Sequence, residues 1–147
     1  MKTLQQLQPM IIEWAKEKDL IKLENAPKQR LKLIEECGEL ASAILKNDIK
    51  EQKDAIGDIF VVLVILSEQL GKEIYFNNNM AYGQSIDAIF KDLISYVFDD
   101  DLDFIISELT GFCHYLNNDM TECANIAWNE IKNRTGKTID GTFIKNE

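Results

Sequence analysis

The sequence predicts an all-α fold, a helical bundle of about five to six helices that forms a single domain over residues 1–147. Helix-capping patterns precede several stretches in which apolar residues recur at helical spacing. A chain of 147 residues is long enough to bury roughly two thirds of its unfolded surface in one domain. We find no repeat, low-complexity tract or linker that would divide it.

The first two helices are predicted from signals at their N-termini. Thr3 with Gln6 has the capping-box pattern, and the apolar stripe that follows predicts a helix to about Lys18. A second helix is predicted from Asn25-Ala-Pro27 to about Lys46, because proline is favoured in the first turn of a helix.

The third element could be a helix or a buried strand. Its apolar run, Ile59 to Leu66, is rich in β-branched residues, which is typical of strands. Asp48 with Glu51 nevertheless forms a capping box before the run, Gly71 stops it, and no turn cluster interrupts the chain between them. We therefore predict one central helix, apolar on all sides and covered by other helices or by a second subunit. This makes a homo-oligomer, a dimer or tetramer, the expected state.

The rest of the chain is predicted as a loop, three helices and an extended tail. Ser85 and Asp119 are candidate N-caps, the latter with Glu122 three residues on. The predicted elements are a loop at 77–84, helices from Ser85 to about Phe98, from about Asp99 to Asn117 and from Asp119 to Gly136, and a tail packed by Phe143 and Ile144.

Charge and cysteine content narrow the functional classes. The net charge is −9, with no cluster of basic residues, so we expect no nucleic-acid partner. The longest apolar run is too short to cross a bilayer as a helix, so we expect no membrane association. Three cysteines without a CxxC pair, and an N-terminus without a signal-peptide pattern, favour a cytoplasmic protein.

Five carboxylates gather in two neighbouring predicted helices. They are Glu35, Glu36, Glu39, Asp54 and Asp58, and spacings of three or four residues place them on shared helix faces. Like charges at these spacings destabilise an isolated helix, so the clustering needs compensation. A hard divalent cation, Mg²⁺ or Mn²⁺ in its place, prefers such oxygen ligands together with substrate phosphates.

Clustered acids on two helices suggest three kinds of function. The first is Mg²⁺-dependent hydrolysis of a phosphoanhydride. The second is a di-iron site, but this needs a Glu-x-x-His pair from each of two helices, and the single histidine excludes it. The third is a helical interaction module whose acids face water. Gly38 and Gly57 count against the last, since each costs about 1 kcal/mol inside a helix and allows a neighbouring helix or a ligand to approach closely.

At these residues the sequence resembles a known family. Lys32-Leu-Ile-Glu35-Glu36-Cys-Gly-Glu39, followed by Ile56-Gly57-Asp58, is similar to the ExxE and ExxD helices of the MazG-like all-α nucleoside triphosphate pyrophosphohydrolases, above all the small single-domain, phage-type versions. The likeness extends weakly to residues 129–143, and residues 72–118 have no counterpart in it. The resemblance implies cleavage of a nucleoside triphosphate between the α and β phosphates, which releases a monophosphate and pyrophosphate.

The resemblance also implies roles for individual residues. Glu36, Glu39 and Asp58 would bind Mg²⁺, and Glu35 would be a further ligand or, like Glu36, a candidate base for the water. Lys32 and Lys132 would contact phosphates, Asn129 matches an amide of the C-terminal motif, and Gln29 and Trp14 would line the nucleoside pocket.

One position departs from the family pattern. The ExxD motif has a Glu three residues before its Asp, and Ala55 stands there in this chain. Asp54, one residue earlier, is the expected substitute as a metal ligand and a further candidate base. The departure keeps a second class of function open, a non-catalytic module related to these enzymes that binds a nucleotide or a protein.

Overall fold

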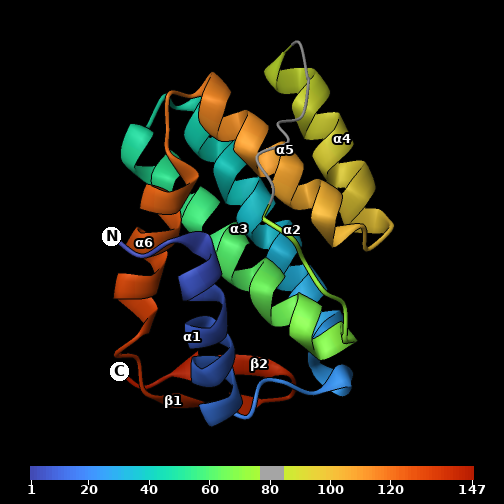
Figure 1. Cartoon of the computed structure of the whole chain (residues 1–147), viewed down its shortest axis with the longest axis vertical. Helices are drawn as coiled ribbons and strands as arrows, with labels where there is room; N and C mark the ends of the chain where they lie inside the picture. Colours follow the sequence, from blue (N-terminus) through green and yellow to red (C-terminus); the bar gives the residue numbers. More distant parts are fainter. Residues whose placement is uncertain (77–84) are drawn as a thin grey trace.

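The computed structural model describes residues 1–76 and 85–147, so the loop predicted at 77–84 lies outside the described residues. Within these residues the chain forms six α-helices and one β-hairpin, which confirms the predicted all-α fold (Figure 1). The elements are α1 (Leu4–Glu17), a 3₁₀ turn (Leu23–Asn25), α2 (Ala26–Leu45), α3 (Ile49–Leu70), α4 (Ile86–Phe98), α5 (Leu102–Tyr115), α6 (Met120–Ile131), β1 (Gly136–Ile139) and β2 (Thr142–Lys145).

The helix α3 is the centre of the molecule. Every residue from Ile59 to Leu66 is buried and helical, so the choice of helix over strand is confirmed. Other helices of the same chain, α1, α2, α5 and α6, pack around it (Figure 1). No helix in the described part of the chain is long and apolar enough to cross a membrane.

Four predicted N-caps are confirmed, and Gln6 completes the predicted capping box at Thr3, whereas Asp48 and Asp119 make only the N-cap half of their predicted boxes among the described residues. The side chains of Thr3, Asp48, Ser85 and Asp119 each accept a hydrogen bond from a backbone N–H in the first turn of the helix that follows. Gly71 ends α3 in the left-handed conformation, with a φ of 65°. These local interactions fix where the helices begin and end before tertiary packing is considered.

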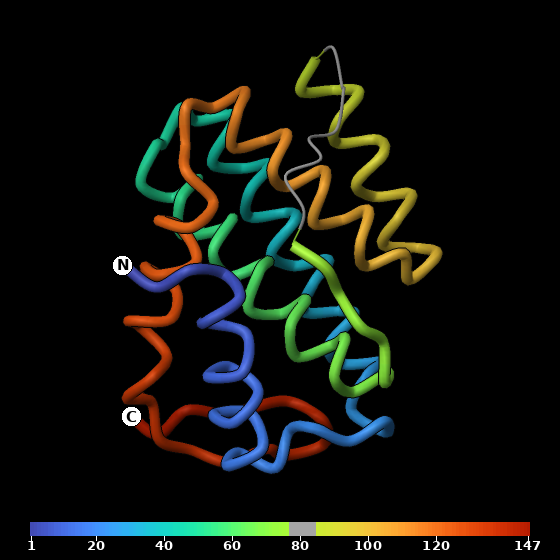
Figure 2. The backbone as a smooth tube through the Cα atoms, viewed as in Figure 1, coloured from blue at the N-terminus to red at the C-terminus, as the bar shows by residue number. Residues whose placement is uncertain are grey.

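The antiparallel pair α4 and α5 packs mainly on itself and lies to one side of the bundle (Figure 2). Asp100, in the turn between the two helices, accepts two hydrogen bonds from the guanidinium of Arg30 on α2, at 2.8 and 2.7 Å. The backbone oxygen of Asp100 also accepts a hydrogen bond from Lys72 Nζ. The turn of the pair is therefore held against the start of α2 and the end of α3.

The C-terminus differs from the prediction. The last helix ends at Ile131 rather than at Gly136, because Gly136 starts a β-hairpin. Gly136 pairs with Lys145, and a side chain at Gly136 would collide with the backbone of Ile144. The loop of the hairpin is Asp140-Gly141, and both residues have positive φ angles, 50° and 82°.

The hairpin covers the lower end of α1 in Figure 1. Thr138 Oγ1 donates to the backbone oxygen of Lys18 at 2.6 Å, and the Phe143 ring meets the Trp14 ring edge to face, with centroids 5.1 Å apart. The prediction that Phe143 packs the tail is confirmed. The same prediction for Ile144 was wrong, since its side chain is 48% exposed.

Candidate active site

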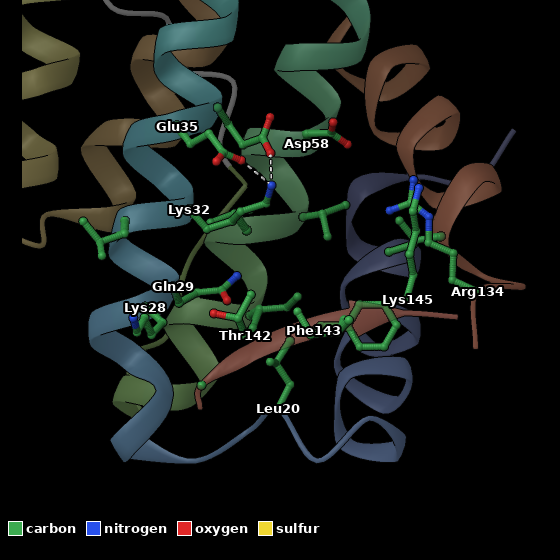
Figure 3. Close-up of a pocket in the computed structure, with 18 of the residues that line it drawn as sticks. Leu20, Lys28, Gln29, Lys32, Glu35, Asp58, Arg134, Thr142, Phe143 and Lys145 are labelled. Carbon is green, nitrogen blue, oxygen red and sulfur yellow. Dashed lines mark hydrogen bonds and ion pairs between the residues drawn. The ribbon is translucent and has the colours of Figure 1, made fainter. Parts of the chain in front are cut away.

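A pocket of about 720 Å³ opens between α2, α3 and the hairpin. Trp14 of α1 and residues at the end of α6 complete its walls. Figure 3 shows carboxylates at one end of this pocket and apolar side chains at the other, with Lys32 and Gln29 of α2 between them. Seven of the predicted site residues line it: Trp14, Gln29, Lys32, Glu35, Glu36, Glu39 and Asp58.

The acidic end of the pocket joins side chains from two helices. Glu36 of α2 is only 3% exposed, whereas Glu35 and Glu39 lie at the exposed rim. Burial, together with the charges of Asp58 and Glu39 and against the effect of Lys32, raises the pKa of Glu36 to about 7. Burial and the charge of Glu130 raise the pKa of Asp58 to about 6, although Arg134 and Lys32 lower it. Both carboxylates line the same pocket in partly desolvated positions, which is the physical cause of the upward shifts in their pKa values.

Close packing of α3 against α6 fixes the position of Asp58. A Cβ atom added to Gly57 would overlap the backbone oxygen of Cys123 and lie 2.9 Å from the Ala127 side chain. Only glycine allows the two helices to approach this closely. A Cβ at Gly38, in contrast, would meet no atom of the described residues within 4 Å. Close approach of a helix is therefore confirmed for Gly57, whereas no helix in the described residues approaches Gly38, and the approach of a ligand there stays a prediction.

Lys32 is the cation nearest the buried carboxylate. Its Nζ lies 2.5 Å from a Glu35 oxygen and 3.0 Å from Glu36 Oε1, as the dashed lines in Figure 3 show. Burial lowers the pKa of Lys32, but its hydrogen bonds to Glu35 and Glu36 raise it more, so the net shift is upward. Lys32 is therefore a permanent positive charge at the acidic end of the pocket.

The donor set at this end suits a hard divalent cation. Glu36 Oε2 is buried and has no hydrogen-bond partner among the described residues, so one oxygen is left for a further ligand. Asp58 and Glu39 add oxygen atoms close enough to raise the pKa of Glu36. Within residues 1–76 and 85–147 no three acidic, histidine or cysteine side chains are already arranged as a metal-ligand set. A cation here would therefore have to draw the carboxylates together.

The opposite end of the pocket is apolar and aromatic. The Trp14 and Phe143 rings form one side of it, and Val62 and Ile65 of α3 form part of another. Three more cations, Lys28, Arg134 and Lys145, also line the pocket. The arrangement offers separate places for a planar apolar group and for an anionic group.

Three predicted site residues do not line this pocket. Asp54 lies outside the pocket, because the pocket extends from Asp58 toward the C-terminal end of α3 and so away from Asp54. Asp54 instead pairs with Lys50 at 2.7 Å. Lys132 Nζ donates to Asn129 Oδ1 at 2.8 Å, and neither residue is among those that line the pocket.

The residues that the hairpin contributes to the pocket are missing from the predicted site. Thr142, Phe143 and Lys145 reach the pocket only because the chain reverses at Asp140-Gly141. An Asp-Gly pair between alternating residues is a strong hairpin signal, and it could have identified this wall of the pocket.

The protein is an all-α protein, and its pocket combines clustered carboxylates, cations and an aromatic wall. Residues 24–89 match the MazG nucleotide pyrophosphohydrolase domain, which confirms the resemblance at the level of the family. The matching segment contains α2 and α3, and hence Glu35, Glu36, Glu39 and Asp58. It does not contain the hairpin.

One curated relative comes from a phage. An uncharacterized 18.2 kDa protein in the rep-hol intergenic region of Haemophilus phage HP1 is 48% identical over 69 residues, which is 47% of this chain and 42% of that protein. The chain therefore aligns with less than half the length of this relative. No solved structure matches the chain.

Proposed function

We propose that the protein is a Mg²⁺-dependent nucleoside triphosphate pyrophosphohydrolase, able to use Mn²⁺ in place of Mg²⁺, that converts a ribo- or deoxyribonucleoside triphosphate into its monophosphate and pyrophosphate. The observation that carries the proposal is the meeting of Glu36, Glu39 and Asp58 in one pocket, within the segment that matches the MazG domain. The match supports nucleotide pyrophosphohydrolase chemistry in general, and the metal and the bond that is cleaved belong to the proposal.

In this proposal Glu36, Glu39 and Asp58 hold the metal. When bound, a divalent cation neutralises phosphate charge and helps to align a water molecule with the α phosphorus. Glu35 then accepts a proton from that water as the new bond from oxygen to phosphorus forms. The bond between the α phosphorus and the bridging oxygen breaks, and pyrophosphate takes up the bonding electrons.

The other residues of the pocket bind and orient the substrate. Lys32 lies where it can pass from Glu35 and Glu36 to a phosphate oxygen, and Arg134 and Lys145 add positive charge to the pocket. The nucleoside occupies the apolar end beside Trp14 and Gln29. Asn129 and Lys132, which bind each other outside the pocket, have no role in this scheme.

A matched pair of variants on α3 tests the proposal. Asp58→Asn removes a carboxylate from the pocket, whereas Asp54→Asn makes the same change one helical turn earlier, outside the pocket. With a panel of nucleoside triphosphates and Mg²⁺, we expect monophosphate and pyrophosphate from the wild-type protein. Asp58→Asn should lose at least about a hundredfold in kcat/KM, in the range found when transition-state charge loses its stabilisation. Asp54→Asn should stay within a few-fold of wild type.

Two results would contradict the proposal. Diphosphate and orthophosphate as the main products would exclude cleavage between the α and β phosphates. Equal losses of kcat/KM in the Asp54 and Asp58 variants would mean that activity does not depend on whether the carboxylate lines the pocket.

The second candidate is a non-catalytic module that binds a nucleotide or a protein. It is favoured by Ala55 at the position of the family's Glu and by the absence of Asp54 from the pocket. Calorimetry with nucleotide, with and without Mg²⁺, distinguishes the two functions, because tight binding without turnover would support the module.

We also propose a homodimer or homotetramer in the cytoplasm. Ile34 of α2 is 49% exposed and Leu45 at its end is 84% exposed, and in this proposal a second subunit covers these apolar side chains. All three cysteines are free and buried, as suits a reducing compartment. Light scattering coupled to size-exclusion chromatography tests the oligomer, and a monomer at micromolar concentration would contradict it.

A further inference from the structure

Gln29 lines the pocket with an amide that has no hydrogen-bond partner among the residues that the structure describes. The residue as a whole is only 6% exposed. Figure 3 shows the amide pointing from α2 into the pocket, toward the hairpin. The amide is therefore open to the pocket, and a ligand that displaces water from it would have to replace the hydrogen bonds of that water.

The position of Gln29 along α2 fits one part of a nucleotide. Gln29 lies seven residues before Glu36, and seven residues of α-helix rise by about 10 Å. Lys32 occupies the turn between them. The amide is therefore separated from the metal-binding end by about the length of a nucleoside and is surrounded by the apolar and aromatic part of the pocket.

We infer that Gln29 is the residue that recognises the nucleobase, through two hydrogen bonds to the edge of the base. The inference rests on the proposed function and deepens it. An amide offers one acceptor and one donor side by side, and adenine, cytosine, guanine and uracil or thymine each present a neighbouring donor and acceptor. Trp14 and Phe143 supply the aromatic wall against which the ring of the base packs.

A phosphate is the alternative occupant of this end, because Lys28 lies beside Gln29 in the pocket (Figure 3). Gln29 itself is neutral, so a phosphate bound here would be held mainly by Lys28. Weaker binding of ribose 5-phosphate by Gln29→Met would reveal a phosphate contact. A sugar hydroxyl could also bond to an amide, and the experiment below separates that outcome from recognition of the base.

Two substitutions at Gln29 test the inference. Gln29→Met keeps the length of the side chain and removes both hydrogen-bonding atoms. Gln29→Glu keeps the shape and leaves acceptors only, which suit guanine best, because its N1–H and exocyclic amine are adjacent donors. Since the wild-type amide has no intramolecular partner, Gln29→Met should melt at or above the wild-type temperature.

The measurement is calorimetric binding of nucleoside monophosphates and of ribose 5-phosphate, which lacks a base. These probes bind without hydrolysis, so the result does not depend on catalysis. We expect Gln29→Met to weaken the preferred monophosphate by roughly tenfold to a hundredfold while leaving ribose 5-phosphate unchanged. In Gln29→Glu, measured at pH 8.5, the affinity ratio of guanosine monophosphate to the other monophosphates should rise by about tenfold or more.

The outcomes distinguish this inference from the proposed function. If the wild-type protein binds monophosphates as expected but hydrolyses no triphosphate, the proposed function fails and the inference stands. If hydrolysis occurs as proposed while both variants keep the wild-type ranking of bases, the inference is overturned. A change in the ratio of ribonucleotide to deoxyribonucleotide binding alone would also overturn it, because the amide would then contact the sugar.

Discussion

The substitution Gly57→Ala tests the packing that holds the acidic end of the pocket. The added methyl group would overlap the backbone oxygen of Cys123 and lie 2.9 Å from the Ala127 side chain, so α3 and α6 would have to move apart. Overpacking of this kind typically costs about 1–3 kcal/mol. Replacing a helical glycine by alanine returns up to about 1 kcal/mol of helix propensity. Because the obstacle is backbone rather than a flexible side chain, we expect a net loss of about 2 kcal/mol.

The same substitution at Gly38 is the matched control. Gly38 also lies inside a helix beside the acidic residues, but a methyl group there meets nothing in the described residues within 4 Å. Gly38→Ala should therefore gain about 0.5–1 kcal/mol from helix propensity alone. For a chain of this size each kcal/mol shifts Tm by about 2–4 °C, so the two variants should differ by roughly 5–12 °C.

Urea unfolding followed by far-UV circular dichroism measures both effects at one protein concentration. The reasoning would be refuted if Gly57→Ala were as stable as the wild-type protein, or if Gly38→Ala lost as much stability as Gly57→Ala. In the first case α6 would not be in close contact with α3 at this position. In the second case Gly38 would contribute to stability in a way that steric contact with neighbouring atoms does not explain.

Two further predictions concern charge. Burial and the charge of Asp92 raise the pKa of Glu108 to about 7, and its Oε2 has no hydrogen-bond partner among the described residues. Ionisation of Glu108 therefore lowers the stability of the folded protein as pH rises from about 4.5 through 7. In melting curves Glu108→Gln should be more stable than wild type at pH 8, by up to about 3 kcal/mol, and the gap should be smaller at pH 5. Lys32→Met, studied with a chelator present, should lose about 1–2 kcal/mol at pH 8, because Glu36 keeps a buried charge without its partner, and less at pH 5, where Glu36 is protonated. An equal stability gap at both pH values would contradict either prediction.

Much of the fold could be predicted because its signals are local. The apolar run from Ile59 to Leu66 resembles a strand by composition, but the cap at Asp48 and the stop at Gly71 lie on either side of it, and the structure has one helix there. The hairpin was missed for a related reason. Gly136 was interpreted as a helix stop, whereas its conformation serves the pairing with Lys145 and the turn at Asp140-Gly141.

The site was predictable where helical periodicity alone decides it. Glu36 and Glu39 share a face of α2, and this relation does not depend on the rest of the fold. Asp54 and Asp58 are also close on a helix, yet only Asp58 lines the pocket. Which end of α3 the pocket follows depends on how α2, α6 and the hairpin pack, and no spacing within α3 contains that information. The Asp140-Gly141 pair signals the reversal that brings Lys145 back along the chain, but that the hairpin then packs beside α2 and α3 is a tertiary relation that the signal does not contain.

The charges inside the pocket bear on how this acidic protein would bind the proposed triphosphate. The chain carries a net charge of −9, but the pocket itself is lined by four carboxylates, Glu35, Glu36, Glu39 and Asp58, and by four cations, Lys28, Lys32, Arg134 and Lys145. The formal charges of these side chains therefore sum to zero when all four carboxylates are ionised, and a triphosphate would add negative charge to that site within a negative field. A divalent cation held by the carboxylates would offset that charge and release Lys32 from Glu35 and Glu36 toward the phosphates. Metal and nucleotide would then each strengthen the binding of the other, which is the coupling that a metal-dependent phosphoanhydride hydrolase requires.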